Sequence, residues 1–303
     1  MKIVLTGATG FIGQALTRRL LDLGHEIQVL VRHLPKAVQD GTRKTFVLWD
    51  GKNAGDWWQA LEGAEAVINL AGENIGARLW TSQQKHRILS SRIEATRALV
   101  KAIENIPHKP KVFLSASAVG YYGHVPDGGV TEVDSQGSGF LADVCKLWEE
   151  EAMRAQPFGL RVVTTRFGLV LEKNGGMLQK MLTPFHYFFG GPLGSGRQWI
   201  SWVHRKDLIE ALVFLLGRED VSGPVNITAP APERMKEFCQ TIGLILNRPS
   251  WFRVPAVILK FMLGEMSEMI LTGQRVLPEK LLHAGFHFFY PSLKKALEEI
   301  FVK

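Results

Sequence analysis

The sequence predicts an α/β fold, in which a doubly wound parallel sheet is followed by a smaller C-terminal lobe. β-rich runs alternate with helical patterns through the first half of the chain, as crossover connections between parallel strands require. Three glycines separate the first strand from the first helix, and after about residue 172 the pattern changes to glycine- and proline-rich loops. Together these observations indicate a layered domain and a second, smaller part.

Six short runs rich in apolar residues are predicted to be the strands of the sheet. Each is separated from the next by enough chain for a crossover, which parallel neighbours need. The runs are residues 2–6, 26–32, 45–48, 66–70, 111–115 and 161–167.

Three helices are predicted from apolar residues at helical spacing. The first covers residues 11–23 and is followed by Gly24, a residue suited to the left-handed conformation at a helix end. The second begins at Thr81, which forms a capping box with Gln84. The third covers roughly residues 142–155.

The chain is predicted to divide near residue 172. Residues 1–172 would form the sheet domain, and residues 173–303 a mixed region with a loop-rich segment and a C-terminal lobe. We expect some elements of the second region to return to the sheet, because the loops after residue 172 are followed by further helical patterns.

Composition indicates a folded protein of a reducing compartment. Of the 303 residues, 46% are hydrophobic and 21% charged, which is the globular range. The two cysteines, Cys145 and Cys239, lie far apart without histidines at metal spacing, so neither a disulfide framework nor a metal site is predicted. No secretory signal and no transmembrane segment is recognised, and we expect a cytoplasmic protein without membrane partners. The net charge of +7 is spread along the chain without a basic run, so nucleic acid is not expected as a partner.

The turn between the first strand and the first helix predicts a phosphate-binding site. Gly7 would permit the tight turn, Gly10 the close approach of a pyrophosphate, and Gly13 the packing of helix on strand. Backbone amides at the start of the helix would face the phosphates, and the cofactor-binding residues of this turn include Thr9, Phe11 and Ile12 as well. The order of strand, turn, helix and second strand favours a Rossmann-type dinucleotide site over a simple glycine turn.

The end of the second predicted strand indicates the type of dinucleotide. An NAD site would place an acidic residue there for the ribose hydroxyls, whereas this strand ends in Arg32. An arginine can pair with a 2′-phosphate through charge-assisted hydrogen bonds. NADP(H) is therefore the predicted cofactor, with a solvated strand-end arginine as the alternative.

Motifs along most of the chain resemble the extended short-chain dehydrogenase/reductases. They include TGATGFIG at 6–13, NLAG at 69–72, YYG at 121–123 and VHRKD at 203–207. Further stretches resemble the atypical subgroup called epimerase family protein, which carries a C-terminal domain of unknown function. These are NLAGENI at 69–75, RLW at 78–80, SRIEATR at 91–97, GGPLGSGRQW at 190–199 and GEMSEM with GQRVLP at 264–278.

The resemblance implies further cofactor contacts at the carboxyl edge of the sheet. Leu70, Ala71 and Gly72 follow the fourth strand, and Gly168 follows the sixth, beside the expected position of the nicotinamide. Arg92 occupies a helix position at which the parent family has an asparagine, and it would contact a cofactor phosphate or an acidic substrate. An exposed helical arginine is the alternative reading of Arg92.

The resemblance also implies catalytic residues, but the pattern is altered. The parent family uses a serine or threonine with a tyrosine and a lysine four residues apart, in which the tyrosine moves the proton. Lys146 fits the lysine, whereas Ala142 stands at the tyrosine position. The family's hydroxyl position falls on Ala118, with Ser117 one residue away. Tyr121 and Tyr122 are the candidates to replace the missing tyrosine. Packing at the strand end is the alternative role for Tyr122.

The leading hypothesis is an NADP(H)-binding oxidoreductase or nucleoside-sugar epimerase-like protein. Its substrate would be a small polar or anionic molecule bound on the side of the C-terminal lobe. The alternative is a non-catalytic NADP(H)-binding sensor or docking protein, because Ala142 can neither donate nor accept a proton. The substrate, the oligomeric state and the residue that replaces the tyrosine stay open at this point.

Overall fold

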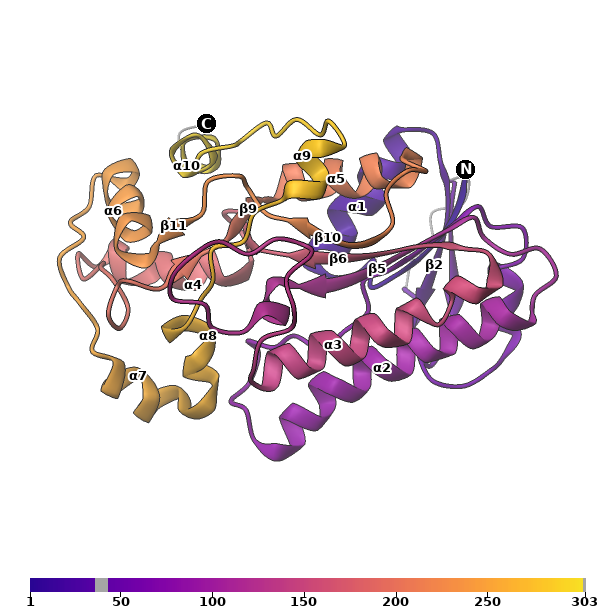
Figure 1. Ribbon diagram of the computed structural model, residues 1–303, viewed down its shortest axis with the longest axis horizontal. Helices are drawn as coiled ribbons and strands as arrows, with labels where there is room; N and C mark the ends of the chain where they lie inside the picture. The colour runs from indigo at the N-terminus through magenta and orange to yellow at the C-terminus, as the bar shows by residue number, and fades with distance from the viewer. Residues whose placement is uncertain (36–42, 302–303) are drawn as a thin grey trace.

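The protein is described by a computed structural model that covers residues 1–35 and 43–301. Within these residues, seven parallel strands form one sheet in the order β10-β6-β5-β4-β1-β2-β3 (Figure 1). Their bounds are β1 Lys2–Thr6, β2 Glu26–Val31, β3 Lys44–Leu48, β4 Ala66–Asn69, β5 Val112–Ala118, β6 Arg161–Phe167 and β10 Gly223–Ile227. The predicted doubly wound α/β fold is confirmed.

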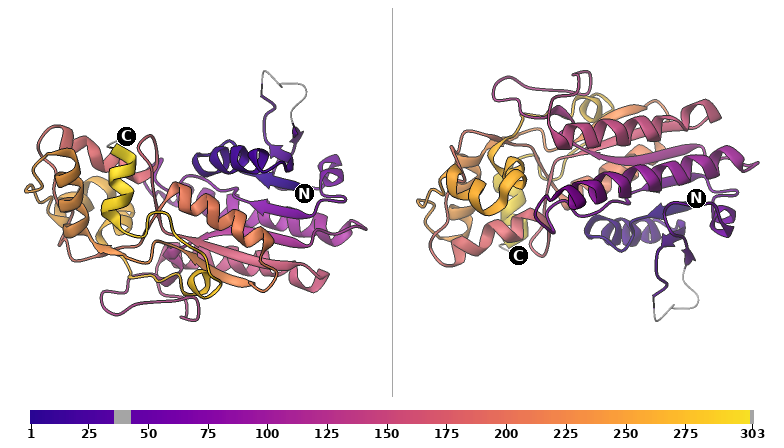
Figure 2. Two further views of the ribbon diagram at one scale, coloured as in Figure 1. Left: turned by 90° about the horizontal axis from the view of Figure 1, so that it is seen from above. Right: turned by 90° about the horizontal axis from the view of Figure 1, so that it is seen from below.

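Helices cover both faces of the sheet and bury its apolar side chains. On one face, Leu16, Leu208 and Leu281 from three helices join one core with the strands. On the other face, Leu99 and Ala152 from two further helices join a second core. Figure 2 shows the two helical layers from opposite sides. The helices are α1 Phe11–Asp22, α5 Arg205–Gly217 and α9 Glu279–His283 on the first face, and α2 Ser82–Asn105 and α3 Phe140–Met153 on the second.

The strand order reverses between β1 and β4. The chain leaves β1 to build β2 and β3 on one side, and later builds β4, β5, β6 and β10 on the other. In open α/β sheets, ligands bind beside the carboxyl ends of the strands at this reversal. The turn after β1 and the loop after β4 therefore border the expected site.

The predicted caps of the helices form in part. Gly24 has φ +82°, as predicted for the residue after the first helix. The Thr81 side chain accepts a hydrogen bond from the Gln84 N–H at 3.2 Å. In a complete capping box, the Gln84 side chain would also bond back to Thr81. Here it instead donates to Glu73 Oε1 at 3.5 Å.

The C-terminal lobe has its own apolar core beside the carboxyl edge of the sheet (Figure 1). Two short strand pairs lie in this region, β7 with β9 in parallel and β8 with β11 antiparallel. The elements are β7 Leu169–Leu171, α4 Gly176–His186, β8 Trp199–Ile200, β9 Trp202–His204, β11 Glu233–Arg234, α6 Met235–Leu246, α7 Ala256–Leu263, η4 Gly264–Ser267, α8 Glu268–Leu271 and α10 Leu293–Phe301. Short 3-10 turns η1 Asp56–Ala60, η2 Val119–Tyr122 and η3 Gln156–Phe158 complete the structure.

The two regions of the chain are interleaved around the sheet. Helix α5 packs beside α1, and β10 pairs with β6 at the sheet edge, although both follow residue 172. The boundary near residue 172 stays a prediction. None of the helices in the described ranges combines the length and hydropathy that crossing a membrane would need.

Candidate functional site: a dinucleotide cradle and a buried polar network

Two glycines of the turn after β1 are required by close backbone contacts. Gly7 has φ +70°, and a Cβ there would lie 2.6 Å from the Leu70 carbonyl oxygen. A Cβ on Gly13 would lie 2.2 Å from the Gly7 carbonyl oxygen. Any side chain at either position would therefore push the helix or the neighbouring loop away.

Gly10 is exposed to solvent and has one close backbone neighbour. Of the described atoms, a Cβ on Gly10 would meet within 4 Å only the Gly7 carbonyl oxygen, at 3.2 Å. Gly10 is also the N-cap of α1 and supplies no capping side chain, and the first turn of this fully described helix has no acidic residue. The amides of Phe11 and Ile12 belong to the first helical turn, where an α-helix has no acceptor of its own. The cradle over Gly10 therefore fits an anionic group.

The loop after β4 forms the second side of the cradle. Leu70 lies against Gly7, and its N–H donates to Thr6 Oγ1 at 3.2 Å. The Ala71 N–H donates to Asn69 Oδ1 at 3.3 Å. Thr9 on the other side is fixed by Gln14, whose side chain donates to the Thr9 carbonyl oxygen at 2.8 Å. The predicted cofactor residues of the turn and of this loop are thus brought together.

Arg92 lies beside Gly72 as a partly buried cation. A Cβ on Gly72 would lie 3.0 Å from Arg92 Cζ, and the guanidinium lies 5.0 Å from the Trp148 ring centroid. Arg92 Nη1 donates to the carbonyl oxygens of Glu73 at 3.1 Å and Ile88 at 2.9 Å. Burial lowers the pKa of Arg92, and the nearby charge of Glu73 opposes this shift. A cation whose hydrogen bonds go to carbonyl oxygens is well suited to an anionic ligand.

Arg32 is exposed immediately after β2. This strand neighbours β1 in the sheet, so its carboxyl end lies on the same edge as the glycine turn. The position is the one from which a side chain reaches the adenosine ribose in dinucleotide-binding folds.

Gly168 follows β6, and its lack of a side chain has a packing reason. A Cβ there would lie 2.7 Å from the Ser201 carbonyl oxygen and 2.9 Å from Thr228 Cγ2. From the sequence, we expected Gly168 to lie against the cofactor. The structure shows that Ser201, between β8 and β9, and Thr228, directly after β10, occupy this space, while the cofactor contact stays a prediction.

Ser117 and Tyr122 belong to one buried network centred on Arg166. The Ser117 hydroxyl donates to Glu149 Oε1 at 2.6 Å. Arg166 binds Glu149 through Nε and Nη2, each at 2.8 Å, and its Nη1 donates to the Tyr122 hydroxyl at 2.8 Å. The Tyr122 hydroxyl donates to Asn226 Oδ1 at 2.8 Å. The network therefore joins β5, α3, β6, η2 and β10.

The environment of Tyr122 disfavours its ionised form. The residue is 1% exposed, and burial raises its pKa to about 12 although Arg166 opposes this shift. The pKa of Arg166 is raised, because the hydrogen bonds and charge of Glu149 outweigh burial, which lowers it. Arg166, and no lysine, is the cation that opposes the raised pKa of Tyr122 among the described residues, and a proton-transferring role of Tyr122 stays a prediction.

Lys146 is not brought to Ser117 or Tyr122 in the contacts that the structure describes. Its side chain is 50% exposed, and Nζ lies 3.9 Å from Glu150 Oε1 one turn along α3. Ala142 is buried at the position of the family tyrosine. No contact among the described residues joins the half-exposed Lys146 to the buried Tyr122, and their role as a catalytic pair stays a prediction.

Sequence reasoning missed Glu149 and Asn226, which hold the network together. A signal was present in β6, because an arginine within an otherwise buried strand needs a carboxylate partner. No comparable signal distinguishes Glu149 from the adjacent Glu150 and Glu151. Among the residues that the structure describes, no group of His, Cys, Asp and Glu is arranged to hold a metal ion.

Comparisons with known proteins agree with this architecture. The family model described as NAD dependent epimerase/dehydratase family matches residues 3–228, and a domain of unknown function (DUF1731) matches residues 254–300. The chain is 43% identical to an epimerase family protein SDR39U1 homolog, chloroplastic, from Arabidopsis thaliana, over 99% of this chain and 86% of the relative.

Comparison with solved structures shows the same fold. A crystal structure of human epimerase family protein SDR39U1 (isoform 2) with NADPH matches with a TM-score of 0.85 and 32% identity over 99% of both chains. The fold alone is shared with a UDP-glucuronic acid 4-epimerase from Bacillus cereus, with a TM-score of 0.79 and 18% identity over 100% of this chain and 98% of that one. The chain therefore belongs to the NAD dependent epimerase/dehydratase family, and within it to the extended short-chain dehydrogenase/reductases that are named epimerase family proteins.

Proposed function

We propose that this protein binds NADP(H) in the cradle formed by the glycine turn and the loop after β4. The observation that carries the proposal is the exposed Gly10 at a helix start without a capping or acidic side chain. Phosphate groups bind well at such a helix start. The human relative with NADPH supports the same cofactor.

Arg32 is proposed to select NADP(H) over NAD(H). It is exposed at the carboxyl end of β2 and would pair with the 2′-phosphate. Loss of a charged hydrogen bond costs about 1.5 to 3 kcal/mol, which corresponds to about a tenfold or greater loss of affinity.

Calorimetry with NADPH and NADH tests this assignment. Arg32→Ala should weaken NADPH much more than NADH. Arg18→Ala is a matched control, because Arg18 is an exposed arginine near the C-terminal end of α1, away from the carboxyl edge. Equal affinities of the unaltered protein for NADPH and NADH would remove the basis for the role of Arg32.

The activity proposed for the bound state is that of an oxidoreductase or an epimerase-like protein on a small molecule. When bound, the cofactor would supply or accept a hydride. Among the predicted catalytic side chains, Lys146 is the one that solvent reaches, so it is proposed to hold the ribose and move the proton. Ser117 and Tyr122 would then be positioning residues, because their hydrogen bonds help to hold α3, which carries Lys146, against β5 and β6.

A second candidate is an NADP(H)-binding sensor without catalysis. It is favoured by the buried Ala142 at the tyrosine position and by the neutral, fully bonded Tyr122. NADPH oxidation with a panel of carbonyl compounds and sugar nucleotides separates the two. Turnover that Lys146→Ala lowers supports the enzyme. Tight NADPH binding without turnover across the panel supports the sensor.

A further inference from the structure

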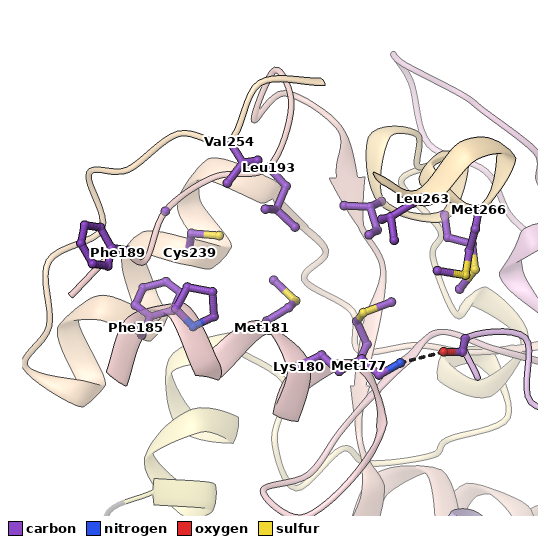
Figure 3. A pocket seen from close by; sticks show the side chains of 15 residues that line it. Met177, Lys180, Met181, Phe185, Phe189, Leu193, Cys239, Val254, Leu263 and Met266 are labelled. Carbon is purple, nitrogen blue, oxygen red and sulfur yellow. Dashed lines mark hydrogen bonds between the residues drawn. The ribbon is translucent and has the colours of Figure 1, made fainter. Parts of the chain in front are cut away.

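The C-terminal domain of unknown function forms one wall of a cavity that is partly open to solvent. The cavity measures about 240 Å³ and lies among α4, α6, α7, η4 and α8 (Figure 3). One wall comes from residues within 254–300, and the opposite wall from α4. The C-terminal residues that line it are Val254, Leu263, Met266, Met269 and Ile270.

The lining is apolar and rich in methionine. Four of the chain's eight methionines contribute to it: Met177 and Met181 from α4, and Met266 and Met269 from the opposite wall. Methionine side chains are unbranched and polarizable, so they adapt to ligands of varied shape. Burial raises the pKa of Cys239 to about 12, so this lining residue contributes a neutral thiol.

One end of the cavity carries a positive charge. Among the described lining residues, Lys180 is the one charged side chain, and it is exposed to solvent. Its Nζ donates to the Gly76 carbonyl oxygen at 2.7 Å (Figure 3). An ammonium group has three donors, so Lys180 can also bind an oxygen of a ligand.

The cavity adjoins the proposed cofactor cradle. Met177 directly follows Gly176, and a Cβ on the preceding Gly175 would lie 2.5 Å from the ring of Phe11 in the glycine turn. Gly76, at the other side, belongs to the loop between β4 and α2.

The C-terminal wall is anchored to the sheet domain. Met266 and Met269 pack against the apolar cluster of Trp80, Ile88 and Val144. Lys85 on α2 forms an ion pair with Glu265 on η4 at 2.6 Å. The wall is thus fixed beside the carboxyl edge of the sheet, where a substrate of this fold would lie.

We propose that the C-terminal domain makes this cavity a binding site for an amphipathic ligand, with an apolar body inside and a carboxylate or carbonyl oxygen at Lys180. This inference rests on the proposed function, because it names the substrate class of the same site. A dry cavity of about 150 Å³ holds benzene, so the cavity of this protein has room for roughly nine or ten carbon atoms. A nucleotide sugar does not fit the lining, because its diphosphate would need several cationic or N–H donors. The proposed ligand is therefore more apolar than the small polar substrate expected from the sequence.

Methyl NMR of the protein labelled at its methionine methyl groups tests the proposal, with sodium nonanoate as the probe. Nonanoate should shift the methyl signals of Met177, Met181, Met266 and Met269 in a saturable way. Met1, Met153 and Met262 do not line the cavity and should not shift. The titration is done with and without NADPH, and NADPH binding is measured separately by calorimetry. Cavity shifts without any NADPH binding would reject the proposed cofactor and retain the ligand site.

Three variants sharpen the result. Met181→Lys should abolish the cavity shifts, whereas Met262→Lys should not, because Met262 is 64% exposed on α7. Lys180→Met changes an exposed residue and should leave the fold intact, but should weaken nonanoate about tenfold through loss of a charged hydrogen bond. Nonanoate affinity that is unchanged in Lys180→Met would overturn the assigned orientation. UDP-glucuronic acid that shifts the cavity methyls while nonanoate does not would overturn the ligand class.

Discussion

Glu149 and Arg166 form a two-point ion pair inside the interface between α3 and the sheet. Nε and Nη2 of Arg166 each lie 2.8 Å from a different carboxylate oxygen of Glu149, and the side chains are 3% and 10% exposed. Arg166 also stacks on the ring of Tyr121, with its Cζ 3.5 Å from the centroid. The pair therefore fixes helix α3, which carries Lys146, against the strand that leads to Gly168.

Loss of one partner of this pair should strongly destabilise the fold. Glu149→Ala leaves the Arg166 charge buried without a carboxylate, which costs about 3 to 5 kcal/mol in comparable cases. Urea denaturation followed by circular dichroism measures the change. Asp220→Asn, which breaks the exposed pair with Arg218, is the control and should leave the midpoint nearly unchanged because solvent screens that pair. Similar midpoints for the two variants would contradict the structural role of Glu149.

Tyr122→Phe should reduce stability and change its dependence on alkaline pH. The substitution leaves Asn226 Oδ1 and Arg166 Nη1 without their partner, at a cost of about 1 to 3 kcal/mol. Burial raises the Tyr122 pKa from its ordinary value of 10.0 to about 12, so the unfolded chain loses this proton first as pH rises. The unaltered protein should therefore lose stability between pH 10 and 12 more steeply than the variant does.

Urea midpoints at pH 8, 10 and 11 measure this difference, with about the same protein concentration in each series. Tyr121→Phe is the matched control, because it removes a hydroxyl from the neighbouring ring, which packs edge-on against Tyr122. Parallel curves for Tyr122→Phe and the unaltered protein above pH 10 would show that the Tyr122 pKa is not raised.

Stability should also fall in mild acid because of His204. Its Nδ1 accepts a hydrogen bond from the Lys206 N–H at 3.2 Å, which requires the neutral ring. Burial lowers the His204 pKa from 6.5 to about 4, so between these values the unfolded chain binds a proton that the folded protein does not. The stability that the neutral His204 contributes is therefore fully present above about pH 6.5 and is lost as pH falls toward 4.

His204→Asn keeps a side chain that can cap α5 and removes the titration. The variant should lose less stability than the unaltered protein between pH 7 and pH 4.5, as measured by urea midpoints at each pH. An equal loss in both proteins would mean that another group causes the acid sensitivity.

Gly10→Val should abolish NADPH binding and leave the protein folded. The φ of Gly10 is −79°, which valine can adopt. The new Cβ would lie 3.2 Å from the Gly7 carbonyl oxygen, a contact that a small shift of the turn relieves, and the rest of the side chain would cover the exposed start of α1. Calorimetry measures binding, and circular dichroism checks the fold. Gly217→Val is the control, because Gly217 is exposed at the end of α5 with no described atom within 4 Å of its Cβ position. A Gly10→Val protein that binds NADPH normally would show that the cradle has been misassigned.

The local pattern of the sequence predicted six of the seven strands of the described sheet and the glycine turn, but not β10. The predicted strands at residues 2–6 and 161–167 coincide with β1 and β6. This succeeds because strand periodicity and turn geometry depend on residues that are neighbours in the chain. The roles of Gly7 and Gly13 follow in the same way, since a tight turn between a strand and a helix leaves no room for a Cβ.

Only the tertiary structure decided what Ser117 and Tyr122 contact. Their partners Glu149 and Asn226 lie 32 and 104 residues away, and no local pattern indicates such pairings. The apolar cavity likewise arises only when Met177 and Met269, from distant parts of the chain, face one another. Periodicity predicts which face of a helix is buried, but the side chains that meet across an interface are fixed by the packing of whole elements.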